Sequence, residues 1–315
     1  MITFLSGGTG TPKLIDGFRK ILKDTDIAVI ANTADNFWVY GLYVAPDVDT
    51  VMYLFANLLD KKRYWGIKRD TFKTMDIIKR VSKESWFNIG DKDLSIHLAR
   101  THLLNMGLSL SSITKRLCHT FNVKAEVIPA TEEHMETRIV TENGVDLHFQ
   151  EFWVKYKGNV DVKKVYFKNL ETVTVPQRAL KLLEESDLII IGPSNPVTSI
   201  GPIINLLPIR DRLKKNRDKC IAVSPIIGNQ PVSGPAGKLM KAINVESTAE
   251  GVAELYSEFI GLLVIDHRDT GLQTKIEKKY DIKVFTANIF FRNSRDAASL
   301  AKKILKVTYN EKISG

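Results

Sequence analysis

The chain is poor in several features that mark whole classes of protein. It has only two cysteines in 315 residues, Cys118 and Cys220, and no CxxC spacing, which argues against a disulfide framework or a zinc cluster. No apolar run approaches the roughly 20 residues of a membrane span, and the first residues lack the basic and apolar regions of a signal peptide. We therefore expect a cytoplasmic protein with reduced thiols and no membrane partner.

Acidic residues are outnumbered by basic ones. The 45 Lys and Arg against 36 Asp and Glu give a formal net charge of +9, spread along the chain in short clusters. Such an excess steers anionic ligands toward a protein. No recognised nucleic-acid-binding motif accompanies it. We expect small anionic ligands and no nucleic acid.

Four apolar runs, each typical of a buried strand, lead directly into turns rich in Gly, Ser, Thr, Asn and Pro. The runs cover residues 2–5, 27–30, 188–191 and 221–223. In an open parallel sheet such turns share one edge, where the carboxyl ends of the strands form a ligand-binding crevice. The sequence therefore predicts a binding site at that edge.

The periodicity of apolar residues divides the rest of the chain. Residues 50–122 show only helical spacing, which predicts a helical insertion over one end of the sheet. Residues 125–156 are predicted to be extended, with Asn143-Gly144 as the turn of an antiparallel hairpin. A single helix is predicted over residues 200–215.

Strands and helices then alternate to the end of the chain, with strands expected near residues 165, 188, 221, 262 and 283. No linker separates domains. The fold prediction is one α/β domain, residues 1–315, with a Rossmann-like three-layer parallel sheet core, a helical insertion and an antiparallel hairpin.

The turn after the first strand, residues 6–13, has the composition of a phosphate-binding loop. Its glycines allow close approach of backbone amides at a helix start, which favours phosphate. It lacks both the GxxxxGK[ST] spacing and the third glycine of GxGxxG. Gly8, Thr9, Gly10 and Lys13 are the candidate phosphate contacts, and a tight turn without a ligand is the alternative.

Carboxylates follow the second strand. Asp35 lies in its turn, and Asp47 and Asp49 begin the next helical segment. Carboxylates at a helix start often cap free amides, and we assign that role to Asp47. Asp35 and Asp49 are the candidate ligands for Mg²⁺, which takes oxygen ligands and bridges to substrate phosphates.

Two further segments have unusual composition. Lys92 lies between Asp91 and Asp93 at a predicted helix start, where a cation opposes the helix dipole and indicates an anionic or electron-rich partner. Residues 192–202 and 224–238 contain six of the eleven prolines. Proline fixes backbone dihedrals and so holds amides and hydroxyls in place before a ligand arrives.

Taken together, these motifs closely resemble the 2-phospho-L-lactate transferases, the CofD family, of deazaflavin coenzyme (factor 420) biosynthesis. The resemblance extends from residue 6 to residue 238 and is carried, in order, by Ser6-Gly7-Gly8-Thr9-Gly10-Thr11-Pro12-Lys13, Pro46-Asp47-Val48-Asp49-Thr50, Gly90-Asp91-Lys92-Asp93-Leu94, His148-Phe149-Gln150-Glu151-Phe152-Trp153, Gly192-Pro193-Ser194-Asn195-Pro196, Ser199-Ile200-Gly201-Pro202 and Ser224-Pro225-Ile226-Ile227-Gly228.

The resemblance implies a reaction. A 2-phospholactyl or phosphoenolpyruvyl group would pass from a guanosine diphosphate ester to the ribityl hydroxyl of 7,8-didemethyl-8-hydroxy-5-deazariboflavin, with release of GMP. Catalysis of this kind depends mainly on positioning and charge neutralisation.

The resemblance also implies roles for the residues. Asp35 and Asp49 would hold Mg²⁺, and Asp49, the candidate catalytic residue, would contact the deazaflavin together with Lys92. The phosphate and nucleotide side would be formed by Gly8, Thr9, Gly10, Lys13, Asn32, Asn195, Ser224 and Gly228. The family often has arginine where Lys92 stands, and lysine lacks the planar bidentate geometry of that group.

Three questions stay open at this point. The sequence does not decide between the lactyl and enolpyruvyl donors, which differ by two hydrogens. It does not fix the oligomeric state, for which a homodimer is one expectation. A nucleotide-sugar-binding regulatory protein, from a paralogous group with the same glycine turn and core, is the alternative function. A nicotinamide dehydrogenase is disfavoured by the broken glycine fingerprint.

Overall fold

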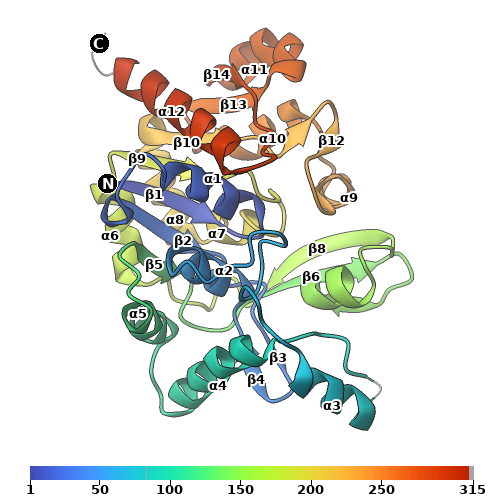
Figure 1. Cartoon of the computed structure of the whole chain (residues 1–315). Coiled ribbons are helices and arrows are strands. Elements are labelled where there is room, and N and C mark those ends of the chain that lie inside the picture. The colour runs from blue at the N-terminus through green and yellow to red at the C-terminus, as the bar shows by residue number, and fades with distance from the viewer. Residues whose placement is uncertain (83, 312–315) are drawn as a thin grey trace.

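A seven-stranded parallel sheet forms the centre of the computed structural model, which describes residues 1–82 and 84–311 (Figure 1). Its strands lie in the order β14-β13-β10-β9-β1-β2-β5. In chain order they are β1 (Ile2–Ser6), β2 (Ile27–Ala31), β5 (Glu126–Pro129), β9 (Leu188–Ile191), β10 (Cys220–Val223), β13 (Leu262–Asp266) and β14 (Lys283–Ala287). The continuous apolar runs form these strands because parallel sheets are buried on both faces.

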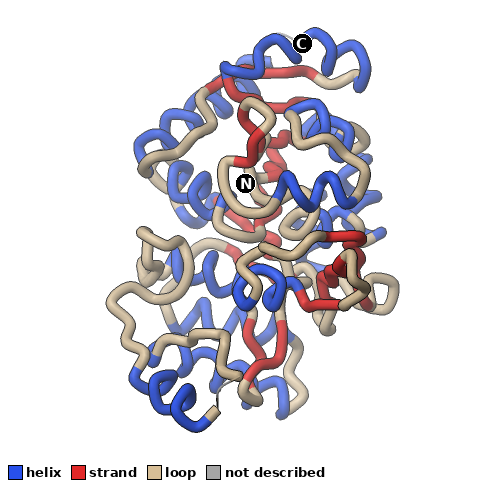
Figure 2. Tube along the Cα trace, turned by 90° about the vertical axis from the view of Figure 1, so that its right-hand side faces the viewer, coloured by secondary structure: helices blue, strands red, loops and turns tan. Residues whose placement is uncertain are grey.

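Helices cover both faces of the sheet, as Figure 2 shows for its upper half. Alternate strand residues enter two separate apolar cores: Phe4 belongs to one and Leu5 to the other. The first face is covered by α1 (Gly10–Phe18), α2 (Pro46–Phe55), α5 (Leu110–Thr120) and α12 (Ser294–Glu311). The second face is covered by α6 (Gln177–Glu185), α7 (Gly201–Ile204), α8 (Leu207–Lys215), α10 (Ala249–Tyr256) and α11 (Gln273–Tyr280).

Part of the remaining chain extends from one end of the sheet, and Figure 1 shows α3, α4, β3 and β4 below it. Three small antiparallel sheets are formed by β3 (Phe37–Val39) with β4 (Leu42–Val44), by β6 (Glu136–Thr141) with β7 (Asp146–His148) and β8 (Val162–Lys168), and by β11 (Ile226–Ile227) with β12 (Gln230–Pro231). The other helical elements are α3 (Lys73–Val81), α4 (Asp91–Asn105), α9 (Ala236–Ala242), the short 3-10 helices η1 (Asp24–Asp26), η3 (Arg217–Lys219) and η4 (His267–Leu272), and the π-helical turn η2 (Glu151–Lys155).

The predicted fold class is confirmed: the molecule has a three-layer α/β architecture with a parallel sheet and added antiparallel hairpins. The four predicted runs are the adjacent strands β10, β9, β1 and β2. The chain builds β2 and β5 on one side of β1 and then reverses to place β9 on the other. This reversal puts the topological switch point between β1 and β9, where open α/β sheets bind ligands.

Several local predictions were wrong. The strand near residue 165 belongs to the antiparallel sheet of β6 and β8, outside the central sheet. The extended segment expected up to residue 156 ends at His148, and a π-helical turn follows. The helix expected over residues 200–215 is divided into α7 and α8, with Pro208 near the start of the second. The hairpin of β3 and β4 was not predicted.

The starts of α3 and α4 cap each other. The Asp91 carboxylate accepts hydrogen bonds from the backbone N–H groups of Lys73 and Thr74, at 3.0 and 2.9 Å. In return, Asp70 accepts from the amides of Lys92 and Asp93, at 2.8 and 3.1 Å. Although Asp91 is the first residue of α4, its carboxylate therefore caps the preceding helix, α3. The exchange fixes the two helices relative to each other.

Among the helices described, none combines the length and the apolar character that crossing a bilayer requires.

Candidate active site

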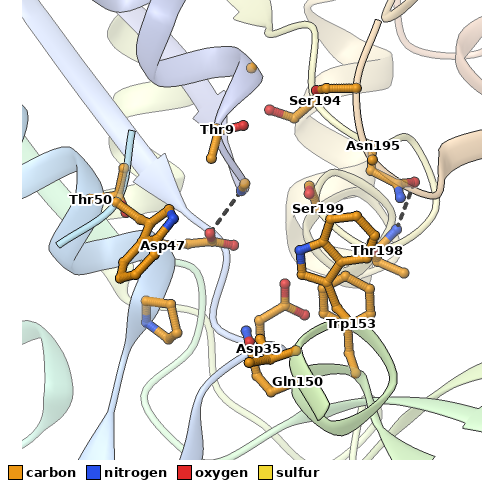
Figure 3. Close-up of a pocket in the computed structure, with 18 of the residues that line it drawn as sticks. Thr9, Asp35, Asp47, Thr50, Gln150, Trp153, Ser194, Asn195, Thr198 and Ser199 are labelled. Carbon is orange, nitrogen blue, oxygen red and sulfur yellow. Dashed lines mark hydrogen bonds between the residues drawn. The ribbon is translucent and has the colours of Figure 1, made fainter. Parts of the chain in front are cut away.

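A cavity of about 530 Å³ opens at the switch point, where the turns that follow β1, β2, β9 and β10 meet. Each of these turns contributes at least one residue to its lining, represented by Gly8, Asp35, Asn195 and Pro225. Figure 3 shows Thr9 and Asp47 on one side, Ser194, Asn195 and Ser199 on the other, and Asp35 with Gln150 at one end. Helices α2 and α4, the π-helical turn and residues 232–236 complete the walls.

The turns after β1 and β9 touch through their backbones. A Cβ atom built on Gly10 would lie 2.0 Å from the carbonyl oxygen of Pro193. Beside this contact the Ser194 hydroxyl accepts a hydrogen bond from the Thr11 amide at 2.9 Å, and the Ser194 and Thr11 hydroxyls lie 2.7 Å apart. The absence of a side chain at Gly10 therefore allows the two halves of the sheet edge to meet.

Asp47 holds the glycine turn in place. Its carboxylate accepts hydrogen bonds from the Gly8 amide at 2.8 Å and from Asn32 Nδ2 at 2.9 Å. Gly8 has φ of +57°, a conformation that glycine adopts without strain. The prediction that Asp47 caps its own helix was wrong: α2 starts after Ala45 with no side-chain cap, and the Asp47 carboxylate faces the turn across the sheet edge.

Asp35 and Asp47 form a buried carboxylate pair. Burial and the charge of Asp47 raise the pKa of Asp35 well above its usual value. Burial raises the pKa of Asp47 to about 6, against the opposing effect of its bonds from Asn32 and Gly8. Asp35 Oδ1 is buried and has no hydrogen-bond partner among the described residues. A bound cation would offset the repulsion between the two carboxylates and would give Asp35 Oδ1 a ligand contact.

A second polar cluster lies in the seam between α2 and α4. Arg100 Nη1 donates to Asp49 Oδ2 at 3.0 Å, and Arg100 Nη2 donates to Asp49 Oδ1. His97 lies next to both carboxylates of the seam, with Nδ1 3.7 Å from Asp49 and Nε2 3.4 Å from Asp93. The Tyr53 hydroxyl donates to Asp93 at 2.5 Å. Burial raises the pKa of Asp49, and the Arg100 guanidinium opposes that rise.

This seam also contains three groups with the spacing of metal ligands. Asp49, Asp93 and His97 each offer one atom, and these atoms lie within 4.8 Å of one another. A donor set with histidine suits transition metals better than Mg²⁺, which prefers oxygen. A cation bound to Asp49 would also lie next to the positive charge of the Arg100 guanidinium, which binds both Asp49 oxygens and would repel it. The Asp35 and Asp47 pair therefore fits Mg²⁺ better than the seam does.

Other polar atoms at the cavity lack partners. Asn195 Nδ2 and Thr198 Oγ1 are buried, and neither forms a hydrogen bond within the described part of the chain. Both residues line the wall opposite Asp47. Buried polar atoms are nearly always paired in folded proteins. These two atoms, together with Asp35 Oδ1, indicate groups that a ligand would satisfy.

Aromatic rings line the rest of the cavity, from Trp65, Phe87, Phe149 and Trp153. Trp65 and Trp153 are 44% and 40% exposed, which is high for tryptophan. Trp153 lies on the π-helical turn, a helix type often found at functional sites. Flat exposed rings beside buried carboxylates suit a ligand with both a planar ring system and charged groups.

The structure brings together six of the residues predicted from the sequence: Gly8, Thr9, Gly10, Asp35, Asp49 and Asn195 all line the cavity. Asn32 lies just behind, where its side chain supports Asp47. Its role is therefore indirect in this conformation.

The other predicted residues lie outside the lining. Lys13 is half-buried above the Tyr64 ring, 5.2 Å from its centroid, and burial lowers the pKa of its ammonium. Lys92 Nζ donates to the carbonyl of Arg69 at 2.9 Å. The Ser224 hydroxyl bonds to the backbone of its own turn, and the Gly228 amide donates to Asp269. Direct contact of Lys13 or Lys92 with a ligand would require its side chain to turn.

Sequence reasoning assigned no site role to Tyr53, Arg100, Trp65 or Thr198. A signal existed for the seam: Asp49 and Tyr53 are four residues apart, and Asp93, His97 and Arg100 follow i, i+4, i+7 spacing, so each set shares one helix face. No feature of the sequence indicated that these faces of α2 and α4 contact each other. Trp65 and Thr198 lie in irregular segments, where spacing carries no such information.

One buried histidine near the site makes stability depend on pH. His148 stacks on Phe37 with ring centroids 5.3 Å apart, and burial lowers its pKa to about 4. An unfolded histidine titrates near 6.5, so between pH 6.5 and 4 the unfolded state binds a proton that the folded state does not. The contribution of His148 to the free energy of unfolding is therefore fully present above pH 6.5 and is lost as the pH falls toward 4.

We expect this group alone to cost about 2 kcal/mol of the free energy of unfolding at pH 5 relative to pH 7.5. Urea unfolding of the wild type and of His148→Gln at both pH values measures it. The variant is less stable at pH 7.5 but loses less on acidification. An equal pH dependence in both proteins would show that another group is responsible.

The fold and the cavity define a Rossmann-like α/β protein with a candidate site at the switch point of its sheet, lined by a glycine turn, buried carboxylates and aromatic rings. The sequence profile of the 2-phospho-L-lactate transferase CofD family matches residues 2–303. The chain is 44% identical to a 2-phospho-L-lactate transferase of Methanosarcina mazei over 278 residues, 88% of this chain and 90% of that protein. It is 41% identical to one of Methanocaldococcus jannaschii over 309 residues, 97% of each chain.

Among solved structures, a protein of the upf0052 family from Bacillus halodurans superposes with a TM-score of 0.65. The alignment covers 96% of this chain and 99% of that one at 14% sequence identity, which shows a shared fold. The sequence matches establish more than the fold. The chain belongs to the 2-phospho-L-lactate transferase CofD family, as the motifs predicted.

Proposed function

We propose that the protein transfers a 2-phospholactyl or phosphoenolpyruvyl group from a guanosine diphosphate ester to the ribityl hydroxyl of 7,8-didemethyl-8-hydroxy-5-deazariboflavin. The hydroxyl oxygen attacks the phosphorus that bears the organic acid, the bond from that phosphorus to GMP breaks, and GMP leaves. Family membership supports the reaction class. The observation that carries the proposal is the meeting, in one cavity, of a glycine turn, buried carboxylates and aromatic rings.

The donor fits the side of the cavity formed by the turns after β1 and β9. Gly8, Thr9 and Gly10 lie at the start of α1, where backbone amides and the helix dipole attract phosphate. On the opposite wall, Asn195 Nδ2 and Thr198 Oγ1 have no hydrogen-bond partner among the described residues. A diphosphate ester placed between the two turns would satisfy both sets of groups.

Mg²⁺ is the cation that the carboxylates would hold, because its preferred ligands are oxygens. Asp35, with its free buried oxygen, and the adjacent Asp47 fit that role best. Asp49 was the second ligand expected from the sequence, and its pairing with Arg100 favours a different role for it. Bound Mg²⁺ would neutralise charge on the diphosphate.

The acceptor fits the side lined by α2, α4 and the aromatic rings. Asp49 lines the cavity there, and each of its oxygens retains a lone pair beyond the one that Arg100 uses. We assign Asp49 the hydrogen bond from the attacking hydroxyl, whose proton it would accept as the new bond to phosphorus forms. The rings of Trp65 and Phe87 offer flat surfaces for the deazaflavin.

Turnover tests this function directly. The purified protein is incubated with the deazaflavin alcohol, Mg²⁺ and each candidate donor, and GMP is measured. We expect release with one donor to exceed release with the other, and EDTA to stop it. Binding of a guanine nucleotide without any release of GMP would instead favour the nucleotide-binding regulatory function.

Lys92 gives a narrower prediction on the acceptor side. It is exposed and bonded to a backbone carbonyl, so an electrostatic contribution to acceptor binding would be modest. We expect Lys92→Ala to weaken deazaflavin binding about threefold to fivefold and to leave GDP binding unchanged. Titrations of both ligands measure the effect, with Lys115→Ala on the outer face of α5 as control. Equal weakening for both ligands would reject an acceptor-side role.

A further inference from the structure

Among the described residues, Arg100 is the largest side chain that is fully buried. It is 0% exposed, yet it carries a full charge in the seam between α2 and α4. Its two Nη atoms bind the two oxygens of Asp49 in a bidentate contact. Asp49 faces the cavity, whereas Arg100 lies behind it and is not part of the lining. The guanidinium thus reaches the site through the residues in front of it, above all the Asp49 carboxylate.

Stability does not explain this arrangement well. Burying two charges costs several kcal/mol in desolvation, and apolar side chains of similar volume are often as stable or more so. Arg100 Nε, moreover, is buried and has no hydrogen-bond partner among the described residues. A side chain selected for packing alone would not leave a donor unpaired. The geometry is instead organised around Asp49.

The rest of the seam restricts Arg100 in turn. Arg100 Nη1 also lies 3.2 Å from His97 Nδ1. Arginine has only donors, so Nδ1 must accept, and the proton of neutral His97 then lies on Nε2, which faces Asp93 at 3.4 Å. Tyr53 donates to the same Asp93 carboxylate. These contacts link Arg100, His97, Asp93 and Tyr53 in a series, so that each side chain fixes the orientation of its neighbour.

We propose that Arg100 is a positioning residue: it fixes the Asp49 carboxylate so that the lone pairs it leaves free face the hydroxyl of the acceptor alcohol. The inference rests on the proposed function, in which Asp49 receives that hydroxyl. A carboxylate on a single flexible side chain would otherwise rotate among staggered rotamers. A planar two-point contact removes that freedom before the acceptor arrives.

The chain provides a matched control for this idea. Arg19 makes a similar bidentate contact with Asp24, both bonds at 2.9 Å, and neither residue lines the cavity. Replacement of either arginine by methionine removes an arginine–aspartate pair and keeps an extended apolar side chain. Only the pair at the cavity is expected to affect the acceptor.

The experiment compares wild type, Arg100→Met, Arg100→Lys and Arg19→Met by titration with the deazaflavin alcohol and, separately, with GDP. For Arg100→Met we expect acceptor affinity to fall about tenfold or more, with GDP affinity within about twofold of wild type. Arg100→Lys keeps the charge and recovers part of the loss, while Arg19→Met leaves both affinities unchanged. Combined with Asp49→Asn, Arg100→Met adds little further loss, because both act through one contact.

The outcomes separate the two proposals. Equal loss of acceptor and GDP affinity in Arg100→Met, the same loss in Arg19→Met, or full additivity with Asp49→Asn would overturn the positioning role. These are binding measurements, so they do not depend on turnover. A wild type that binds the deazaflavin and releases no GMP would overturn the transfer reaction and leave the role of Arg100 in acceptor binding supported.

Discussion

Replacement of Asp49 by asparagine is expected to lower the rate of GMP release about 100-fold or more. Asparagine keeps the shape of the side chain but supplies no negative charge to receive the proton of the acceptor hydroxyl. The same change leaves the buried Arg100 without its counter-charge. A buried charge that loses its partner costs about 3 kcal/mol or more in stability. The two effects must be measured separately.

GMP release is therefore compared with GDP affinity and with urea unfolding of the same sample. The expected variant binds GDP normally, unfolds at lower urea concentration and transfers slowly. Asp24→Asn is the control, because it weakens the bidentate pair with Arg19, a partly exposed pair outside the cavity. Turnover of Asp49→Asn at the wild-type rate would exclude both a catalytic and a metal-binding role for Asp49.

The central sheet could be predicted because its signal is local. Strands buried on both faces require continuous apolar runs, and no other part of the sequence is needed to recognise one. The hairpin of β3 and β4 illustrates the limit. Its turn is Tyr40-Gly41, and both residues have positive φ, of 53° and 74°. Hairpin turns of that geometry usually carry Asn-Gly or Asp-Gly, so tyrosine conceals the turn.

The strand near residue 165 shows a second limit. β8 was recognised as extended, but periodicity gives no information on which sheet a strand joins. Its register with β6, where Arg138 pairs with Tyr166, depends on contacts nearly 30 residues away in the sequence. The run of residues 162–168 contains three lysines, and charged positions within a strand are typical of an antiparallel sheet with one solvated face. That feature was the available evidence against placing it in the central sheet.

In the site, too, local features could be predicted from the sequence and contacts between distant residues could not. The residues of the glycine turn could be recognised from composition, because close backbone approach requires glycine. The partner of that turn could not, because the Gly8 amide bonds to a carboxylate 39 residues further along the chain. The sequence places Asp47 at the start of its helix in either case, whether its carboxylate caps that helix or bonds to the glycine turn. Only the topology of β1, β2 and α2 distinguishes the two.

Replacement of Gly10 by alanine is expected to lower stability strongly, because the turns after β1 and β9 are in backbone contact at this position. The added Cβ would lie 2.0 Å from the carbonyl oxygen of Pro193 and 2.8 Å from its carbonyl carbon. Both are backbone atoms, so no side chain can turn aside, and proline fixes the local dihedral. The turns must separate, which we expect to cost about 3 kcal/mol of the free energy of unfolding.

Separation of the turns also predicts a loss of function. The Thr11 and Ser194 contact beside Gly10 would open, and the phosphate-facing amides would move away from the wall that carries Asn195. We therefore expect Gly10→Ala to weaken GDP binding together with stability. Gly271→Ala is the matched control, because its added Cβ has no neighbour within 4 Å and its φ is not positive. A Gly10→Ala protein with wild-type GDP affinity would show that the donor does not bind where β1 and β9 diverge.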